Sequence, residues 1–258
     1  MQEYLLLFFL GLCGGFVSGL FGIGGGIVLT PMLSLVGLPL AEASAVSSLQ
    51  VVFSAIANIF ARRKEKAIDY KLGTIIASFG IFGSLLGLSA LSLFKKYNSA
   101  DVFVSIMFVC VMSWLSFVNL KHKEDKSDKV DVVSLRKITI FASFAGVFAG
   151  FLVPIMGVGG GFIIVPFLLH YAKFSKNRAV CTSIFQMLIT SGFASILSIF
   201  VFKTVNVKIA FFVILGAVCS VGLGGRLSKK MPEARFKKLL GLLMLTVAIY
   251  FAIKLIVN

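Results

Sequence analysis

Charged side chains are scarce in this sequence of 258 residues, since Asp, Glu, Lys and Arg together make up only 14% of it. Soluble domains carry about 25% charged and about 45–50% apolar residues. Here 59% of the residues are hydrophobic and the mean hydropathy is +1.03. This composition argues against a soluble globular enzyme, and it excludes a disordered chain, whose hydrophobicity would have to be low.

The residue types that build metal sites and catalytic sites are also few. The chain has two histidines, and no two of its four cysteines form a C-x-x-C pair. The cysteines all lie within apolar stretches, so we interpret them as small packing residues. The sequence therefore predicts no enzyme, no metal and no cofactor.

The excess of positive charge has an explanation other than nucleic-acid binding. The formal net charge is +15, but the basic residues lie between apolar blocks. Membrane proteins place Lys and Arg in this way, in the loops that remain on the cytoplasmic side. We therefore expect the lipid bilayer, and no nucleic acid, as a partner.

Long uncharged stretches divide the chain into eight apolar blocks. They span Tyr4–Val36, Ala43–Ala61, Leu72–Phe94, Val102–Leu120, Ile138–His170, Ala179–Phe202, Ile209–Gly225 and Leu239–Ile253. Six approach the roughly 20 residues that cross a bilayer as a helix, but the first and fifth have 33 residues each. A straight helix of that length would measure about 50 Å, against a hydrocarbon thickness of about 30 Å. Both long blocks carry a glycine cluster and a proline near the middle, so we predict a helix that enters the membrane, stops and returns.

The two halves of the chain resemble each other. Gly22-Ile-Gly-Gly-Gly-Ile-Val-Leu-Thr-Pro31 matches Gly157-Val-Gly-Gly-Gly-Phe-Ile-Ile-Val-Pro166, and Ser47, Gln50 and Ser54 match Ser183, Gln186 and Thr190. Duplicated halves are typical of transporters. We therefore predict a first repeat over residues 1–120, a polar cytoplasmic linker over 121–137 and a second repeat over 138–258.

The distribution of Lys and Arg predicts how the repeats are oriented. If all eight blocks cross once, the two sides of the membrane receive 14 and 11 basic residues; if the two long blocks are re-entrant, they receive 20 and 5. The positive-inside rule favours the second arrangement. The expected fold is an all-α integral membrane protein of two inverted repeats, each with one broken, re-entrant helical hairpin and three transmembrane helices, and with both termini extracytoplasmic.

The glycine clusters are the first candidate binding site. Glycine lets a helix unwind at membrane depth, and the half-helix that resumes presents free N–H groups and a positive dipole end. Two such ends meeting near the midplane would bind an anion. The residues concerned are Gly22, Gly24, Gly25, Gly26, Gly157, Gly159, Gly160 and Gly161. The alternative is that they only allow close helix packing, as nearby G-x-x-x-G spacings do; the duplication favours a site.

A polar stripe follows each glycine cluster. Ser47, Gln50, Ser54 and Asn58 share one helix face, and the second half repeats the pattern. Polar side chains in lipid need partners, so this face should point to the protein interior. Interhelical hydrogen bonds would explain the serines alone, whereas a buried amide without a ligand is costly. The predicted ligands are Ser47, Ser48, Gln50, Thr182, Ser183 and Gln186.

Ionisable side chains are absent from the interior of every block. Carboxylate relays are the usual means of coupling transport to protons, so we expect a simple mechanism. An anion that leaves an inside-negative cell gains about 2.3 kcal/mol per charge per 100 mV. Export of an anion would therefore need no coupled ion.

These motifs resemble those of the sulfite exporter TauE/SafE family of membrane permeases. The likeness lies in Phe21-Gly-Ile-Gly-Gly-Gly with Pro31, in Gly157-Val-Gly-Gly-Gly with Pro166, and in the small-hydroxyl stretches Ala45-Val-Ser-Ser and Ala179-Val-Cys-Thr-Ser. The resemblance implies a multi-pass inner-membrane protein that exports sulfite or small organosulfonates such as sulfoacetate.

The expected function is therefore export of a small sulfur-containing anion by alternating access. A passive anion channel of the same fold and an uptake permease for thiosulfate or sulfate are the alternatives. A membrane enzyme or a partner-binding subunit is disfavoured, because the blocks lack a buried His, Asp or Cys constellation. The sequence leaves the oligomeric state open.

Overall fold

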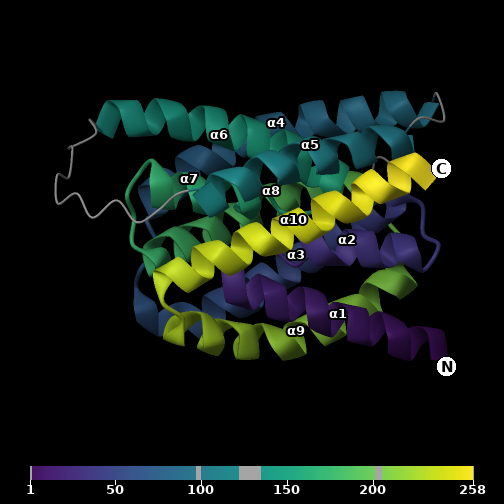
Figure 1. Cartoon of the computed structure of the whole chain (residues 1–258), viewed down its shortest axis with the longest axis horizontal. Coiled ribbons are helices and arrows are strands. Elements are labelled where there is room, and N and C mark those ends of the chain that lie inside the picture. Colours follow the sequence, from purple (N-terminus) through teal and green to yellow (C-terminus); the bar gives the residue numbers. More distant parts are fainter. Residues whose placement is uncertain (1, 97–99, 122–134, 201–204, 258) are drawn as a thin grey trace.

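The helices of the computed structural model run side by side along its long axis (Figure 1). The structure describes residues 2–96, 100–121, 135–200 and 205–257. The helices are α1 (Gln2–Phe21), α2 (Gly26–Leu35), α3 (Leu40–Arg62), the short 3-10 helix η1 (Arg63–Glu65), α4 (Tyr70–Lys96), α5 (Ala100–Lys121), α6 (Leu135–Met156), α7 (Gly161–His170), α8 (Lys176–Phe200), α9 (Val207–Lys230) and α10 (Glu233–Val257). No strand occurs within these ranges.

Length and composition make this a membrane protein. Among the described residues, eight helices are long and apolar enough to cross a bilayer, whereas the apolar helices α2 and α7, with 10 residues each, are too short. Most of the large side chains that the bundle leaves exposed are Phe, Leu and Ile, as expected where lipid tails are the solvent. The prediction of an all-α integral membrane protein is confirmed.

Both long apolar blocks are broken at their glycine clusters, as predicted. The chain leaves α1 at Phe21 and resumes a helix at Gly26, and it leaves α6 at Met156 and resumes at Gly161. Five glycines in the two breaks have positive φ angles between 64° and 83°, which side chains with a Cβ rarely adopt. The breaks therefore follow directly from the sequence.

After each break the chain turns back. Leu33 near the end of α2 shares a buried cluster with Leu7 near the start of α1. The ring of Tyr171, which follows α7, lies 4.8 Å from that of Phe141 near the start of α6. However, α1 and α6 have 20 and 22 residues and are each long enough to cross the bilayer alone. That they are re-entrant limbs, and that the repeats are inverted, therefore remain predictions.

The two halves of the chain interleave. Helix α1 packs along α9 and α6 packs along α4, while α3 contacts α8 and α5 contacts α10. Small residues allow the first two pairs to approach closely. A Cβ on Gly15 would lie 2.1 Å from the Ala217 carbonyl oxygen, and one on Gly83 would lie 2.0 Å from that of Val147. For these glycines, close helix packing is the correct interpretation.

The boundaries of the predicted linker shift slightly. Helix α5 ends at Lys121 and α6 begins at Leu135, so the first residue and the last three residues of the linker predicted over 121–137 are helical. Residues 122–134 lie outside the described ranges.

The basic loops gather at one end of the bundle, opposite the end at which α1 begins and α10 ends (Figure 1). We call it the basic end and define it by residues 62–71, 171–178 and 226–238. Ion pairs join these loops: Glu65 to Lys229 and Asp69 to Arg178. These three loops therefore form one connected surface at the basic end.

Candidate functional site

The two glycine breaks touch each other in the middle of the bundle. A Cβ on Gly26, the first residue of α2, would lie 1.7 Å from the carbonyl oxygen of Gly157. A Cβ on Gly24 would lie 2.5 Å from the carbonyl oxygen of Val158, and one on Gly161 would lie 2.8 Å from the Cα of Ile23. All eight glycines of the predicted site are buried. Only glycine permits this backbone-to-backbone contact, which we call the crossing.

Two helix N-termini meet at the crossing. Helix α2 runs from it toward the end where α1 begins, and α7 runs from it toward the basic end (Figure 1). The N-cap residues are Gly25 and Gly160, which offer no side-chain cap. The first N–H groups of each helix have no carbonyl one turn earlier within their own helix. Both positive dipole ends therefore face the same point.

Hydroxyl groups hold the broken ends in place. Ser48 donates to the carbonyl of Val153 (3.3 Å) and Ser183 donates to that of Gly22 (3.1 Å). Thr30 donates to the Met156 carbonyl (2.9 Å). Carbonyls near a helix end need such partners, because the next turn of helix is missing. Ser48 and Ser183 are thus engaged with backbone in this conformation.

Ser47 and Thr182, two further polar residues of the predicted site, differ in their hydrogen-bond partners. The Ser47 hydroxyl is fully buried and has no hydrogen-bond partner among the described residues. Thr182 instead accepts a hydrogen bond from the Asp69 N–H (3.0 Å) and so belongs to the basic end. Ser48 and Ser183 thus lie against the broken ends, whereas Thr182 does not.

The two glutamines occupy matching environments. Gln50 Nε2 donates to Ser54 and Gln186 Nε2 donates to Thr190, one turn further along each helix. Both side chains are fully buried, and neither Oε1 has a hydrogen-bond partner among the described residues. The Gln50 amide also faces the crossing, since a Cβ on Gly25 would lie 2.9 Å from its Nε2. Buried polar atoms without partners are rare in proteins. Each Oε1 is an acceptor, which an anion does not bind, but each NH2 group carries a second N–H beyond the one given to Ser54 or Thr190, and that N–H is a donor for an anion.

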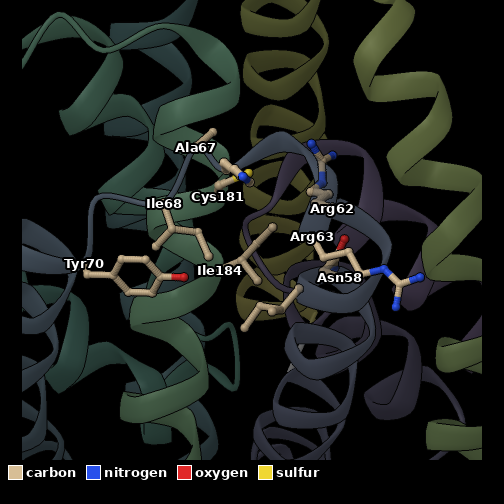
Figure 2. A pocket seen from close by; sticks show the side chains of 10 residues that line it. Asn58, Arg62, Arg63, Ala67, Ile68, Tyr70, Cys181 and Ile184 are labelled. Carbon is tan, nitrogen blue, oxygen red and sulfur yellow. The ribbon is translucent and has the colours of Figure 1, made fainter.

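A cavity of about 370 Å³ opens at the basic end. It is lined by Asn58, Ile59, Arg62, Arg63, Lys66, Ala67, Ile68, Tyr70, Cys181 and Ile184 (Figure 2). Asn58 lies one turn beyond Ser54, which is paired with Gln50. The polar face of α3 therefore leads from the cavity to the crossing.

Arg62 is a further functional candidate, which is not among the predicted site residues. It lies at the last position of α3, just beyond the second apolar block, where a basic residue ordinarily belongs to a solvated loop. Its side chain is 3% exposed. The spacing Gln50, Ser54, Asn58, Arg62 contained the signal, because Arg62 continues the stripe by one more turn.

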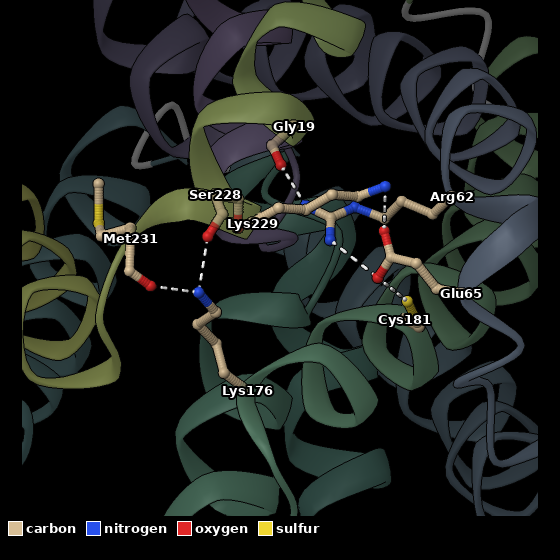
Figure 3. Close-up of polar contacts among 8 residues, drawn as sticks. All are labelled: Gly19, Arg62, Glu65, Lys176, Cys181, Ser228, Lys229 and Met231. Atoms are coloured by element: carbon tan, nitrogen blue, oxygen red, sulfur yellow. Dashed lines mark hydrogen bonds and ion pairs between the residues drawn. The ribbon is translucent and has the colours of Figure 1, made fainter.

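Ion pairs and hydrogen bonds tie four helices together around Arg62 (Figure 3). Its Nη2 donates to the carbonyl of Gly19 in α1 (2.8 Å), and its Nη1 lies 3.6 Å from Glu65. Glu65 in turn pairs with Lys229 of α9 (2.8 Å) and accepts from the Cys181 thiol of α8 (3.6 Å). These contacts couple the two halves of the chain at this end.

The lysine and arginine at the start of α8 are also engaged. Lys176 donates to the carbonyls of Ser228 (2.6 Å) and Met231 (2.5 Å), and Arg178 pairs with Asp69 at 2.6 Å. Asp69 caps α4 through the Leu72 N–H, as its position before the helix predicts. Burial alone would raise the pKa of Asp69, but the hydrogen bond from Leu72 and the Arg178 guanidinium together lower it below its ordinary value.

Comparison with known proteins agrees with this architecture. The sulfite exporter TauE/SafE family matches residues 7–251. A probable membrane transporter protein of Bacillus subtilis, YunE, is 28% identical, and the alignment covers 89% of this chain and 90% of that protein. A probable membrane transporter protein of Methanocaldococcus jannaschii is 29% identical, with 92% of both chains covered. No solved structure is a significant match.

The family and these relatives are membrane transporters rather than enzymes, as the sequence predicts. With nearly its whole length covered by the match, the chain belongs to the sulfite exporter TauE/SafE family.

Proposed function

We propose that the protein exports a small sulfur-containing anion, sulfite or an organosulfonate such as sulfoacetate, by alternating access. The observation that carries this proposal is the crossing, where α2 and α7 direct their N-terminal ends to one point from opposite directions. An anion is the ligand that such ends favour. The backbone around Gly22–Gly26 and Gly157–Gly161 holds the anionic head, and Ser47, Ser48, Gln50, Ser183 and Gln186 orient its oxygens.

The proposed orientation follows from charge. We place the basic end in the cytoplasm and both termini outside the inner membrane, because the positive-inside rule retains Lys and Arg on the cytoplasmic side. The two halves then form inverted repeats. Matching helix pairs support this arrangement, since α1 packs on α9 as α6 packs on α4.

A carrier explains the crossing better than a passive channel does. Backbone atoms of the two breaks are in contact there, as the Gly26 and Gly157 geometry requires. A solute that passes this point must separate them, and the opening motion is the alternating step. The neutral groups at the crossing carry no permanent charge, so the membrane potential suffices to drive an anion outward.

Flux into and out of proteoliposomes tests the proposal. We expect saturable movement of labelled sulfite or sulfoacetate, whereas saturable movement of thiosulfate or sulfate alone would support the uptake permease. Gln50→Ala and Gln186→Ala each should lower the rate by about tenfold or more, because a hydrogen bond to a charged group contributes about 1.5–3 kcal/mol. The control is Ser78→Ala, an exposed hydroxyl of α4 that bonds only to its own helix. Flux that never saturates would support the channel instead, and unchanged rates in both glutamine variants would refute the site.

A further inference from the structure

We propose that the cavity at the basic end is a second anion site, which binds a small organic anion through Arg62 and holds its carbon chain against isoleucines. This inference rests on the proposed function, to which it adds a loading site distinct from the crossing. It also selects among substrates, because it favours an organosulfonate over an inorganic oxyanion.

The anionic head has a buried ligand in Arg62. Two of its three guanidinium nitrogens, Nε and Nη1, have no hydrogen-bond partner among the described residues, although the side chain is only 3% exposed. The nearest carboxylate oxygen of Glu65 lies 3.6 Å from Nη1, beyond the hydrogen-bond range of about 2.7–3.2 Å. Lys229 holds that carboxylate at 2.8 Å. Arg62 therefore retains N–H donors for an oxyanion, and each hydrogen bond to a charged oxygen is a strong one.

The charge around the cavity suits an anion. Arg63 and Lys66 also line it and are exposed, so they attract anions toward the buried Arg62. The fully buried Asn58 amide donates to Ser18 through Nδ2 and leaves Oδ1 without a partner. Turning this amide over would present its NH2 group instead, with Oδ1 accepting from the Ser18 hydroxyl.

The walls of the cavity suit a carbon chain. Three isoleucines and an alanine line it, namely Ile59, Ile68, Ile184 and Ala67. The volume of about 370 Å³ lies within the range of about 300–1,000 Å³ that pockets for small organic ligands have. An inorganic oxyanion would engage the cations but leave these apolar walls unused.

Binding of three alkanesulfonates to the purified protein in detergent tests the proposal. Calorimetry with methanesulfonate, ethanesulfonate and propanesulfonate should show about fourfold tighter binding for each added CH2 group, the ratio expected for its burial. Arg62→Lys keeps the charge but replaces the three guanidinium nitrogens with a single ammonium group, and should weaken the binding of all three sulfonates by about tenfold or more. The matched control is Arg226→Lys, an exposed arginine of the same end that does not line the cavity; it should change affinity less than twofold.

Ile68→Ala provides a test that leaves Arg62 intact. Ile68 lies in the loop before α4. Its truncation should therefore reduce the gain in binding affinity from methanesulfonate to propanesulfonate, while the affinity for methanesulfonate itself stays the same. Equal affinity for all three sulfonates in the wild type would overturn the proposal. The proposal would also be overturned if Arg62→Lys weakened sulfonate binding no more than Arg226→Lys does. If the Arg62→Lys variant fails to fold, the deciding result is Ile68→Ala: an affinity that rises with chain length as steeply as in the wild type would overturn the proposal.

The cavity and the transport proposal can fail separately. Gln186→Ala should lower flux about tenfold or more, as above, and leave the affinity of the cavity for propanesulfonate unchanged, because the glutamine does not line the cavity. A wild type that binds the series as expected but moves no anion would refute transport alone. Normal flux with no chain-length dependence would refute the cavity site alone.

Discussion

Gly26 and Gly157 lie so close that a Cβ on Gly26 would stand 1.7 Å from the carbonyl oxygen of Gly157. The two residues are 131 positions apart and belong to the two breaks in the two halves of the chain. The contact fixes α2 and α7 with their N-terminal ends together. Its consequences, and those of the contacts around it, can be measured.

Gly26→Ala should destabilise the protein by about 3 kcal/mol, a severe overpacking effect, because the new methyl group meets backbone that cannot move aside. The corresponding fall in melting temperature is about 6–12 °C. Gly192→Ala is the matched control, since nothing lies within 4 Å of a Cβ there. It should leave the melting temperature unchanged or raise it, because alanine is the better helix former. Equal effects of the two substitutions would contradict the close contact.

Two equivalent serines should respond differently to removal of their hydroxyls. Ser183 donates to the Gly22 carbonyl, whereas Ser47 has no partner among the described residues. Ser183→Ala should therefore cost about 1 kcal/mol of stability. Ser47→Ala should leave the melting temperature unchanged and lower the transport rate instead. Loss of stability in Ser47→Ala with normal flux would reverse the assignment.

Glu65→Ala should be far more damaging than removal of a surface ion pair. The substitution leaves the buried Arg62 without a nearby carboxylate, and breaking a buried pair costs about 3–5 kcal/mol. Glu233→Ala is the control, because Glu233 forms a comparable pair with Lys237 at 2.8 Å but is 43% exposed. Its loss should cost less than about 1 kcal/mol. The melting temperatures of the Glu65→Ala and Glu233→Ala variants in detergent measure this difference.

The Asp69–Arg178 pair should make stability depend on acid pH. The pKa of Asp69 is lowered in the folded protein, so its contribution is present above the ordinary carboxyl pKa of about 4 and is lost as the pH falls through the lowered value. Asp69→Asn retains an N-cap but loses the charge. The gap in melting temperature between wild type and variant should therefore be widest near pH 6 and should narrow as the pH falls below about 4. A gap that is constant with pH would rule out the ion pair as its source.

Much of the site was predictable from local sequence. The breaks at Gly22–Gly26 and Gly157–Gly161 follow from glycines inside apolar blocks too long for one span. The inward face of Gln50, Ser54 and Asn58 follows from helical spacing, and the caps at Asp69 and Asn206 follow from their positions before helices. The burial of Arg62 is not predictable in this way, because a charge at the end of an apolar block ordinarily lies in solvent. Its contacts with Gly19 and Glu65 in the folded protein show that it is buried.

The sequence by itself determined that this chain lies in a membrane, where its helices break and which residues face its interior. These properties depend on composition and on periodicity within single segments. Only the tertiary structure decided that the breaks touch, that Ser183 binds a carbonyl while Ser47 does not, and that a cavity forms beside Arg62. Those outcomes depend on how helices distant in the chain cross, which the spacing of residues along any one helix does not specify.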